Sequence, residues 1–235
     1  MIKEAIILAG GKGTRLSGVV SDVPKPMAQI NGRPFLEYQI NYLESWGVNH
    51  VVLAVGYMAE AISAHFGNSF NGVKIDYSVE EETLGTGGAI KLAFQKIKGH
   101  SALILNGDTL FDMNIKRLFD FHRIKEADFS IALRFNLKTD RYGSVKMNPD
   151  NRITGFIEKE ENSDEEYING GVYLTKKAYF ESLKFSKSFS LEKEYFEKYV
   201  DKARIYGVKC HSFFIDIGIP EDYILAQDEF ERLQY

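Results

Sequence analysis

Residues 4–16 read EAIILAGGKGTRL, a short apolar run that passes directly into a loop with three glycines. The run is long enough for one buried strand, and the glycines let the backbone turn sharply where the strand ends. Backbone amides in such a turn can point toward an anion, and Lys12 and Arg15 add positive charge beside them. The stretch predicts a phosphate-binding loop after the first strand of an α/β fold. An ordinary glycine-rich turn flanked by surface cations remains the alternative.

Two common phosphate-binding loops do not match this stretch. Leu16 occupies the place of the third glycine in a dinucleotide-binding fingerprint, which disfavours a nicotinamide dehydrogenase. No Gly-Lys-Ser/Thr sequence follows at the spacing of a Walker loop, which disfavours a P-loop kinase.

The first 110 residues alternate apolar β-branched runs with helical patterns. This order is typical of βαβ units on a mostly parallel sheet. From residue 111 short strands follow one another, separated by polar turns, which predicts a smaller antiparallel region over the ends of the parallel strands. The predicted strands are 4–8, 51–55, 73–79, 102–105, 129–133, 144–147, 153–157 and 171–174. The predicted helices are 34–46, 59–66, 89–97, 191–200 and 220–233, with a glycine-rich turn at 85–88.

The predicted fold class is therefore α/β, with a Rossmann-like, mostly parallel mixed sheet. The length of 235 residues suits one domain, which we divide into halves of about 1–110 and about 111–235. The sequence carries no signal for an oligomeric state.

Composition narrows the class of partner. The net charge is −4 and the isoelectric point about 5.8, so no basic field attracts nucleic acid or anionic lipid. No apolar run approaches the roughly 20 residues of a membrane span. With one cysteine, Cys210, and no signal-peptide pattern, we expect a cytoplasmic protein. A few well-placed cations would then hold a small anionic substrate.

A lysine between two prolines is the first such cation. Pro24 and Pro26 restrict the backbone on both sides of Lys25, which lowers the entropy lost when its charged tip is held in place. We predict that Lys25 binds a substrate phosphate, with a rigid surface turn as the alternative.

Two aspartates follow apolar strands, Asp108 in the first half and Asp216 in the second. Open α/β sheets bind ligands at the carboxyl ends of their strands, and carboxylates are good ligands for Mg²⁺. We predict that the two aspartates meet and share one magnesium ion. Turn or helix-capping aspartates have the same pattern.

Two later motifs suit a sugar phosphate. Glu158 can accept hydrogen bonds from sugar hydroxyls, and Lys159 can bind a phosphate. A solvated charge pair without a ligand is the alternative interpretation of these two residues. Asn169 and Gly170 open a later strand.

Taken in chain order, seven motifs resemble those of the sugar nucleotidyltransferase family. The match spans nearly the whole chain and consists of LAGGKGTRL (8–16), PKP (24–26), EEETLGTGG (80–88), NGD (106–108), FIEK (156–159), NGG (169–171) and DIG (216–218). The resemblance implies the nucleotide-diphospho-sugar transferase fold, whose second half binds the sugar.

The resemblance also implies a role at each matched position. Arg15 would bind the leaving pyrophosphate, Lys25 the reacting α-phosphate, and Asp108 with Asp216 a magnesium ion. The nucleotide would contact Leu8, Ala9, Gly10, Gly11, Gly13, Thr14, Glu80, Gly85 and Thr86. The sugar phosphate would contact Gly143, Glu158, Lys159, Asn169 and Gly170.

The implied reaction joins GTP to a sugar 1-phosphate and releases pyrophosphate. Within the family the motifs look most like those of guanylyltransferases for heptose and mannose 1-phosphates, which supply precursors of surface polysaccharides. A related enzyme that uses UTP or dTTP, and a nucleotide-sugar sensor without catalysis, are the alternatives.

Overall fold

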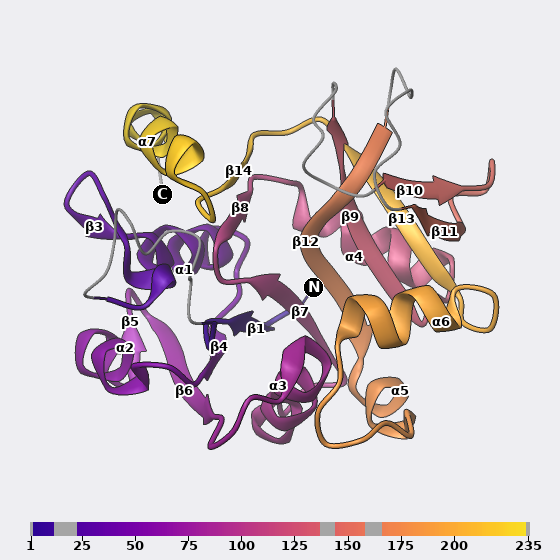
Figure 1. Cartoon of the computed structure of the whole chain (residues 1–235), viewed down its shortest axis with the longest axis horizontal. Helices are drawn as coiled ribbons and strands as arrows, with labels where there is room; N and C mark the ends of the chain where they lie inside the picture. The colour runs from indigo at the N-terminus through magenta and orange to yellow at the C-terminus, as the bar shows by residue number, and fades with distance from the viewer. Residues whose placement is uncertain (1, 12–22, 137–143, 158–165, 234–235) are drawn as a thin grey trace.

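A mostly parallel sheet forms the centre of the fold, as the computed structural model shows (Figure 1). The residues described are 2–11, 23–136, 144–157 and 166–233. The four central strands run parallel in the order β7 (Ser101–Asn106), β1 (Glu4–Leu8), β4 (His50–Val55) and β6 (Val73–Val79). The predicted α/β class and these four strands are confirmed.

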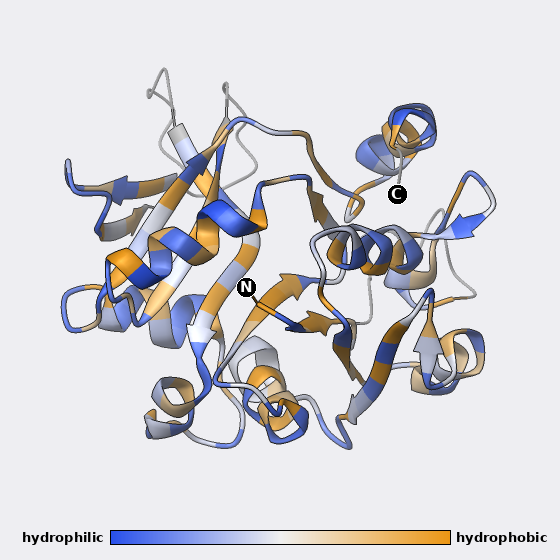
Figure 2. Ribbon diagram, turned by 180° about the vertical axis from the view of Figure 1, so that it is seen from behind, coloured by the Kyte–Doolittle hydropathy of each residue, from blue (hydrophilic) through white to orange (hydrophobic). Residues whose placement is uncertain are grey.

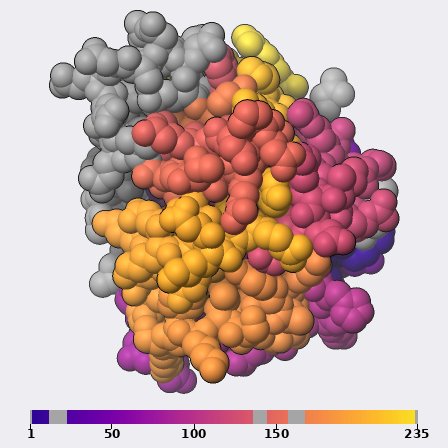
Figure 3. Space-filling view, turned by 90° about the vertical axis from the view of Figure 1, so that its right-hand side faces the viewer, coloured from indigo at the N-terminus to yellow at the C-terminus, as the bar shows by residue number. Residues whose placement is uncertain are grey.

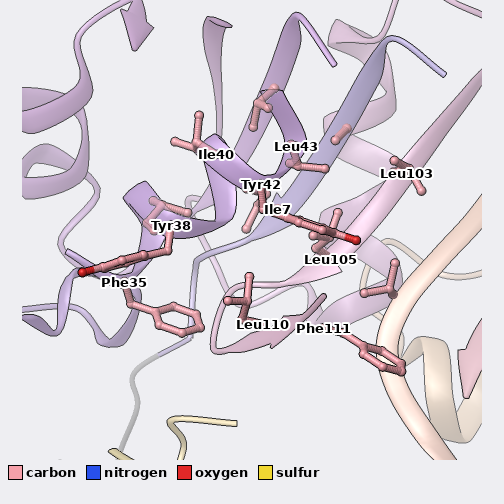
Figure 4. Close-up of a cluster of buried hydrophobic side chains, with 14 of the residues drawn as sticks. Ile7, Phe35, Tyr38, Ile40, Tyr42, Leu43, Leu103, Leu105, Leu110 and Phe111 are labelled. Carbon is pink, nitrogen blue, oxygen red and sulfur yellow. The ribbon is translucent and has the colours of Figure 1, made fainter. Parts of the chain in front are cut away.

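Helices cover both faces of the central strands, which is why these strands are apolar along most of their length. Ile7 packs with residues of α1 (Phe35–Ser45) and α2 (Ala59–Phe66), whereas Ile6 packs with residues of α3 (Gly85–Ala93). Figure 4 shows the side chains of α1 against Ile7 and the strands beside it. Seen from behind, hydrophobic residues concentrate on the central strands (Figure 2).

One long strand, β12 (Glu166–Lys176), joins the second half of the chain to this sheet. It runs antiparallel to β7 along its second part, and it also pairs with β9 (Phe129–Asn136). Beyond these strands lie β13 (Ile205–Cys210) and the hairpin of β10 (Ser144–Met147) and β11 (Ile153–Ile157). Figure 3 shows this side of the molecule, with the hairpin in red above the orange segment that follows β12. The predicted antiparallel region is thus part of the same ten-stranded sheet.

The remaining elements are short strands and surface helices. The strands are β2 (Gln29–Ile30), β3 (Arg33–Pro34), β5 (Ser69–Phe70), β8 (Thr109–Phe111) and β14 (Phe214–Asp216). The α-helices are α4 (Ile115–Ile124), α5 (Lys177–Ser182), α6 (Glu197–Tyr199) and α7 (Pro220–Glu229). The 3₁₀-helices are η1 (Lys25–Met27), η2 (Phe94–Lys96) and η4 (Phe230–Arg232), and η3 (Leu191–Phe196) is a π-helix. No helix in the described ranges has the length and apolar composition needed to span a membrane.

The predicted glycine turn at 85–88 is instead the first turn of α3. The reason is packing, because the segment around Phe189 lies directly on these glycines. A Cβ at Gly87 would lie 2.1 Å from Phe189 Cε2, and one at Gly88 would lie 2.5 Å from the Lys187 oxygen. The Gly87 amide also donates to the Phe189 carbonyl at 3.0 Å. The glycines here allow two segments to meet closely.

Candidate active site

A cavity of about 390 Å³ opens at the carboxyl ends of β1, β4 and β7, the edge where α/β sheets bind ligands. Both halves of the chain contribute to it. Its lining consists of Leu8, Gly10, Gly11, Lys25, Pro26, Ala54, Glu80, Thr83, Gly85, Thr86, Ala89, Asn106, Gly107, Asp108 and Glu192. Most of the described residues predicted to bind the nucleotide therefore surround one space.

The glycine-rich loop begins directly at this edge. The Ala9 amide donates to the Ala54 carbonyl at 2.8 Å, which ties the end of β1 to β4. A Cβ at Gly10 would lie 3.1 Å from Glu80 Oε1 and 3.3 Å from the Gly56 nitrogen, so the loop passes close to its neighbours. Gly11 has open space where a Cβ would lie. The predicted Lys12, Gly13, Thr14 and Arg15 fall outside the described residues.

Lys25 is held at the cavity in an ion pair with Asp108. Its Nζ lies 2.5 Å from Asp108 Oδ2, and the lysine side chain is only 10% exposed against 34% for the aspartate. The proline-flanked η1 turn places Lys25 there, and the lysine tip lies 2.5 Å from where a Cβ of Gly218 would be. Three motifs far apart in the sequence, 24–26, 106–108 and 216–218, thus meet at one point.

Asp216 reaches this point through a two-stranded pairing. In the β8–β14 ladder Asp216 lies opposite Thr109, the residue after Asp108. The Ile217 amide donates to the Asp108 carbonyl at 2.9 Å, and the Gly218 amide donates to Asp216 Oδ1 at 2.7 Å. The backbones of the two aspartates therefore lie close together, and the shared magnesium ion stays a prediction.

The chemistry of this pair suits a hard divalent cation. Both side chains offer carboxylate oxygens, which Mg²⁺ prefers while it keeps several waters and phosphate oxygens as ligands. Among the described residues no cluster of three or more histidine, cysteine, aspartate or glutamate side chains forms a closed metal cage. Two carboxylates beside an open cavity suit a metal that binds together with its phosphate substrate.

Glu80 faces the glycine loop from the end of β6. Its amide donates to the Val55 carbonyl at 2.8 Å, and its Oε2 accepts from the Leu84 amide at 3.0 Å. Burial raises the pKa of the Glu80 carboxyl above its ordinary value, and the Leu84 hydrogen bond partly opposes that rise. A partly buried carboxylate on this wall is an acceptor for paired N–H donors.

Thr86 and Glu192 form a second polar group on the wall. The Thr86 hydroxyl donates to Glu192 Oε2 at 2.6 Å and accepts from the Leu191 amide at 2.9 Å. Sequence reasoning missed Glu192, because a glutamate in the first turn of a predicted helix is ordinary. Only the fold brings η3 beside the start of α3.

The predicted sugar-phosphate residues are placed less directly. Asn169 donates to the Tyr173 hydroxyl at 2.9 Å and accepts from the Gly171 amide at 3.0 Å, at a bulge in β12. A Cβ at Gly170 would lie 2.5 Å from Phe111 Cδ1, so Gly170 lets β12 pack on β8. Neither Asn169 nor Gly170 is among the described residues that line the cavity. Gly143, Glu158 and Lys159 fall outside the described residues, and the predicted sugar contacts stay predictions.

The sequence model of the nucleotidyl transferase family matches residues 4–232 of this chain. The chain belongs to this family. The motif-based assignment to nucleotidyltransferases is thereby confirmed.

Relatives of this nucleotidyl transferase match almost from end to end. D-glycero-alpha-D-manno-heptose 1-phosphate guanylyltransferase of Aneurinibacillus thermoaerophilus is 46% identical, over 97% of this chain and 99% of the relative. The protein of the same name from Campylobacter jejuni is 42% identical, over 94% and 96%. The crystal structure of HddC from Yersinia pseudotuberculosis superposes with a TM-score of 0.87 at 35% identity, over 97% of this chain and all of that one. HddC has also been solved in complex with GMP-PN.

Proposed function

We propose that this protein transfers the guanylyl group of GTP to D-glycero-α-D-manno-heptose 1-phosphate, which yields GDP-heptose and pyrophosphate. The name of two relatives at 46% and 42% identity, matched over nearly their whole length, supports the substrates. The observation that carries the reaction class is the meeting of Lys25, Asp108 and the 216–218 turn at the mouth of the cavity. We also propose a cytoplasmic location, since Cys210 is a buried cysteine outside any disulfide.

The reaction is an in-line substitution at the α-phosphorus of GTP. An oxygen of the sugar phosphate forms the new P–O bond, and the bond to the bridging oxygen of the β-phosphate breaks, so pyrophosphate leaves with the electron pair. The phosphate is already an anionic nucleophile, so no general base is needed. Catalysis then rests on alignment and on the neutralisation of charge.

The cavity residues are assigned roles in aligning the phosphates and neutralising their charge. The ammonium group of Lys25 has three N–H donors, and the one on Asp108 leaves others to turn toward the α-phosphate. Gly10 and Gly11 line the cavity, and without side chains their backbone would be able to approach the nucleotide closely. Arg15, outside the described residues, is assigned to the pyrophosphate from the motif alone. Lys25 thus stabilises the charge that develops during transfer.

Asp108 and Asp216 would hold the magnesium ion. A bound Mg²⁺ would neutralise the phosphate charges, as in other phosphoryl-type transfers. The Asp108 carboxylate, which pairs with Lys25, would be one of the two ligands. The Gly218 amide, which holds Asp216 Oδ1, sets the position of the second carboxylate.

Guanine recognition falls to Glu80. The ring N–H and the amino group of guanine present two adjacent donors, and a carboxylate presents two acceptors. The Leu84 amide holds Glu80 through Oε2, and Oε1 of the same carboxylate lies next to Gly10 of the glycine loop.

The test is a pyrophosphate-release screen. GTP, ATP, UTP and dTTP are each combined with heptose, mannose and glucose 1-phosphates, with and without magnesium. We expect turnover to be fastest with GTP and the heptose phosphate, and to need the metal. Faster turnover with UTP or dTTP than with GTP would contradict the assignment of the base. Faster turnover with mannose 1-phosphate than with the heptose phosphate would contradict the assignment of the sugar.

A further inference from the structure

Glu192 is a carboxylate on the cavity wall that the reaction described above does not use. It lines the cavity together with Glu80 and Asp108, to which the base and the metal are assigned. Its Oε2 accepts from the hydroxyls of Thr86 at 2.6 Å and Ser190 at 3.0 Å. Within the described ranges its Oε1 has no hydrogen-bond partner.

The position of Glu192 is fixed by the segment that carries it. Phe189 and Leu84 are joined by an amide-to-carbonyl hydrogen bond of 3.0 Å, and the Leu191 amide donates to the Thr86 hydroxyl. Ser190 caps η3 by accepting from the Lys193 amide at 3.1 Å. A side chain anchored in this way loses little conformational entropy when a ligand binds.

The location of Glu192 points toward the sugar side of the cavity. The buried Tyr173 hydroxyl, which accepts from Asn169, has a pKa raised first by burial and also by the negative charge of Glu192. The ring of Phe196, in the same helix η3, lies 5.6 Å from the ring of Tyr173, so the helix that carries Glu192 packs against β12, the strand with the predicted sugar motif.

The charge of Glu192 restricts what can bind it. Both substrates are polyanions, so a carboxylate beside them repels phosphate groups. Sugar hydroxyls are neutral donors, and a hydrogen bond to a charged acceptor is stronger than one between neutral groups. With one oxygen held by two protein hydroxyls, the other suits a ligand hydroxyl.

We propose that Glu192 accepts a hydrogen bond from a ring hydroxyl of the sugar 1-phosphate, and that Thr86 is the positioning residue that aims it. This inference rests on the proposed function. Hydroxyls of the GTP ribose offer the same chemistry, so the experiment has to separate the two sources.

The test measures steady-state constants for Glu192→Gln, which keeps the shape but places an amide group in the cavity. We expect kcat/KM for the sugar 1-phosphate to fall about 10- to 100-fold, while KM for GTP stays within about twofold. Glu192→Asp, which withdraws the charge by one methylene, should show the same selective loss. Glu197→Gln is the matched control, because Glu197 is exposed in the adjoining α6 and is not among the described cavity residues. Its constants should be unchanged.

Substrate analogues then identify the hydroxyl. With the wild-type enzyme, kcat/KM for one deoxy-sugar 1-phosphate should fall by about the same factor as Glu192→Gln causes with the natural sugar phosphate. With the Glu192→Gln variant, removing that hydroxyl should lower kcat/KM little further. If 2′-deoxy-GTP or 3′-deoxy-GTP shows this coupling instead, the ribose is the partner and the inference is overturned. Thr86→Val should weaken sugar binding about 10-fold, and Thr86→Ser should restore it, because the serine hydroxyl can still hold Oε2. A rise confined to KM for GTP in Thr86→Val would overturn its positioning role.

The failures of the two proposals are distinct. A folded wild type that releases no pyrophosphate with any pair of substrates defeats the proposed function, and this inference with it. An active wild type whose Glu192→Gln variant has unchanged sugar constants and an unchanged melting temperature defeats the inference alone.

Discussion

The two sides of the cavity are built in different ways. On the side of the glycine loop, contiguous motifs at strand ends bring backbone close to the ligand space, as at Gly10 and Gly107. In another part of the lining, Glu192 and Thr86 are joined across 106 residues by a side-chain hydrogen bond. The first part can be predicted from local sequence, whereas the second exists only once the segment around Phe189 and η3 has packed on α3.

This difference has a chemical counterpart. Phosphates are common to all nucleotides, so amides and a few cations at a strand edge suit them. Sugars differ in single hydroxyl groups, and their recognition needs side chains aimed one by one. We therefore expect substitutions near Lys25 to affect turnover with every substrate. Substitutions of Glu192 or Thr86 should instead affect the choice between substrates.

The largest effect should come from Asp108→Asn. This change removes the negative charge that the metal and the Lys25 ion pair both depend on, and loss of one such electrostatic group costs about 100- to 1,000-fold in kcat. We expect kcat to fall by more than about 1,000-fold, with the magnesium dependence lost, in a pyrophosphate-release assay. Asp120→Asn, in a surface ion pair with Lys116, is the control. If the magnesium dependence is unchanged, Asp108 is not a ligand of the metal.

Lys25→Ala should follow, with kcat reduced about 100-fold or more. The fold should survive, because the Asp108 carboxylate left behind is one-third exposed and can be hydrated. Circular dichroism and the melting temperature check the fold, and Lys116→Ala is the matched surface control. Turnover within threefold of wild type would mean that Lys25 holds Asp108 and does not act on the phosphate.

The same contrast explains how far the fold could be predicted. Strands β1 and β6 were predicted with their observed ends, because apolar runs stop at glycine or at charge. The prediction for β12 covered only 171–174, since the glycines near a bulge interrupt the apolar pattern. Strand β13 was missed because it is stabilised by pairing with β9, some 75 residues earlier.

One missed element did have a local signal. Asn114 is the N-cap of helix α4, since its side chain accepts from the Arg117 amide at 2.9 Å, and Ile115 and Leu118 lie buried on one face. An N-cap followed by apolar residues three apart predicts a helix. Glu192 had no such signal, because its function depends on a neighbour that only the tertiary fold supplies.

A smaller effect, on selectivity, is expected from Glu80→Gln. The change replaces one acceptor with a donor, which no longer matches the two donors of guanine but suits the N–H and carbonyl of uracil or thymine. We expect kcat/KM for GTP to fall about 10- to 100-fold while that for UTP or dTTP holds or rises. Glu81→Gln, at an exposed neighbour, is the control. An equal loss for all nucleotides would assign Glu80 a structural role.

The smallest effect should be a pH dependence of GTP binding. Because burial raises the pKa of the Glu80 carboxyl, Glu80 takes up a proton at a higher pH than an ordinary glutamate. The protonated acid has lost one of its two acceptors for guanine, so the Kd for GTP should rise a few-fold as the pH falls from 8 toward 5. Direct GTP titrations of the wild type and Glu80→Gln separate this effect from protonation of the phosphates, which both proteins share. If the two proteins show the same pH profile, the Glu80 carboxylate does not bind the base, and the nucleotide side of the cavity selects guanine through other groups.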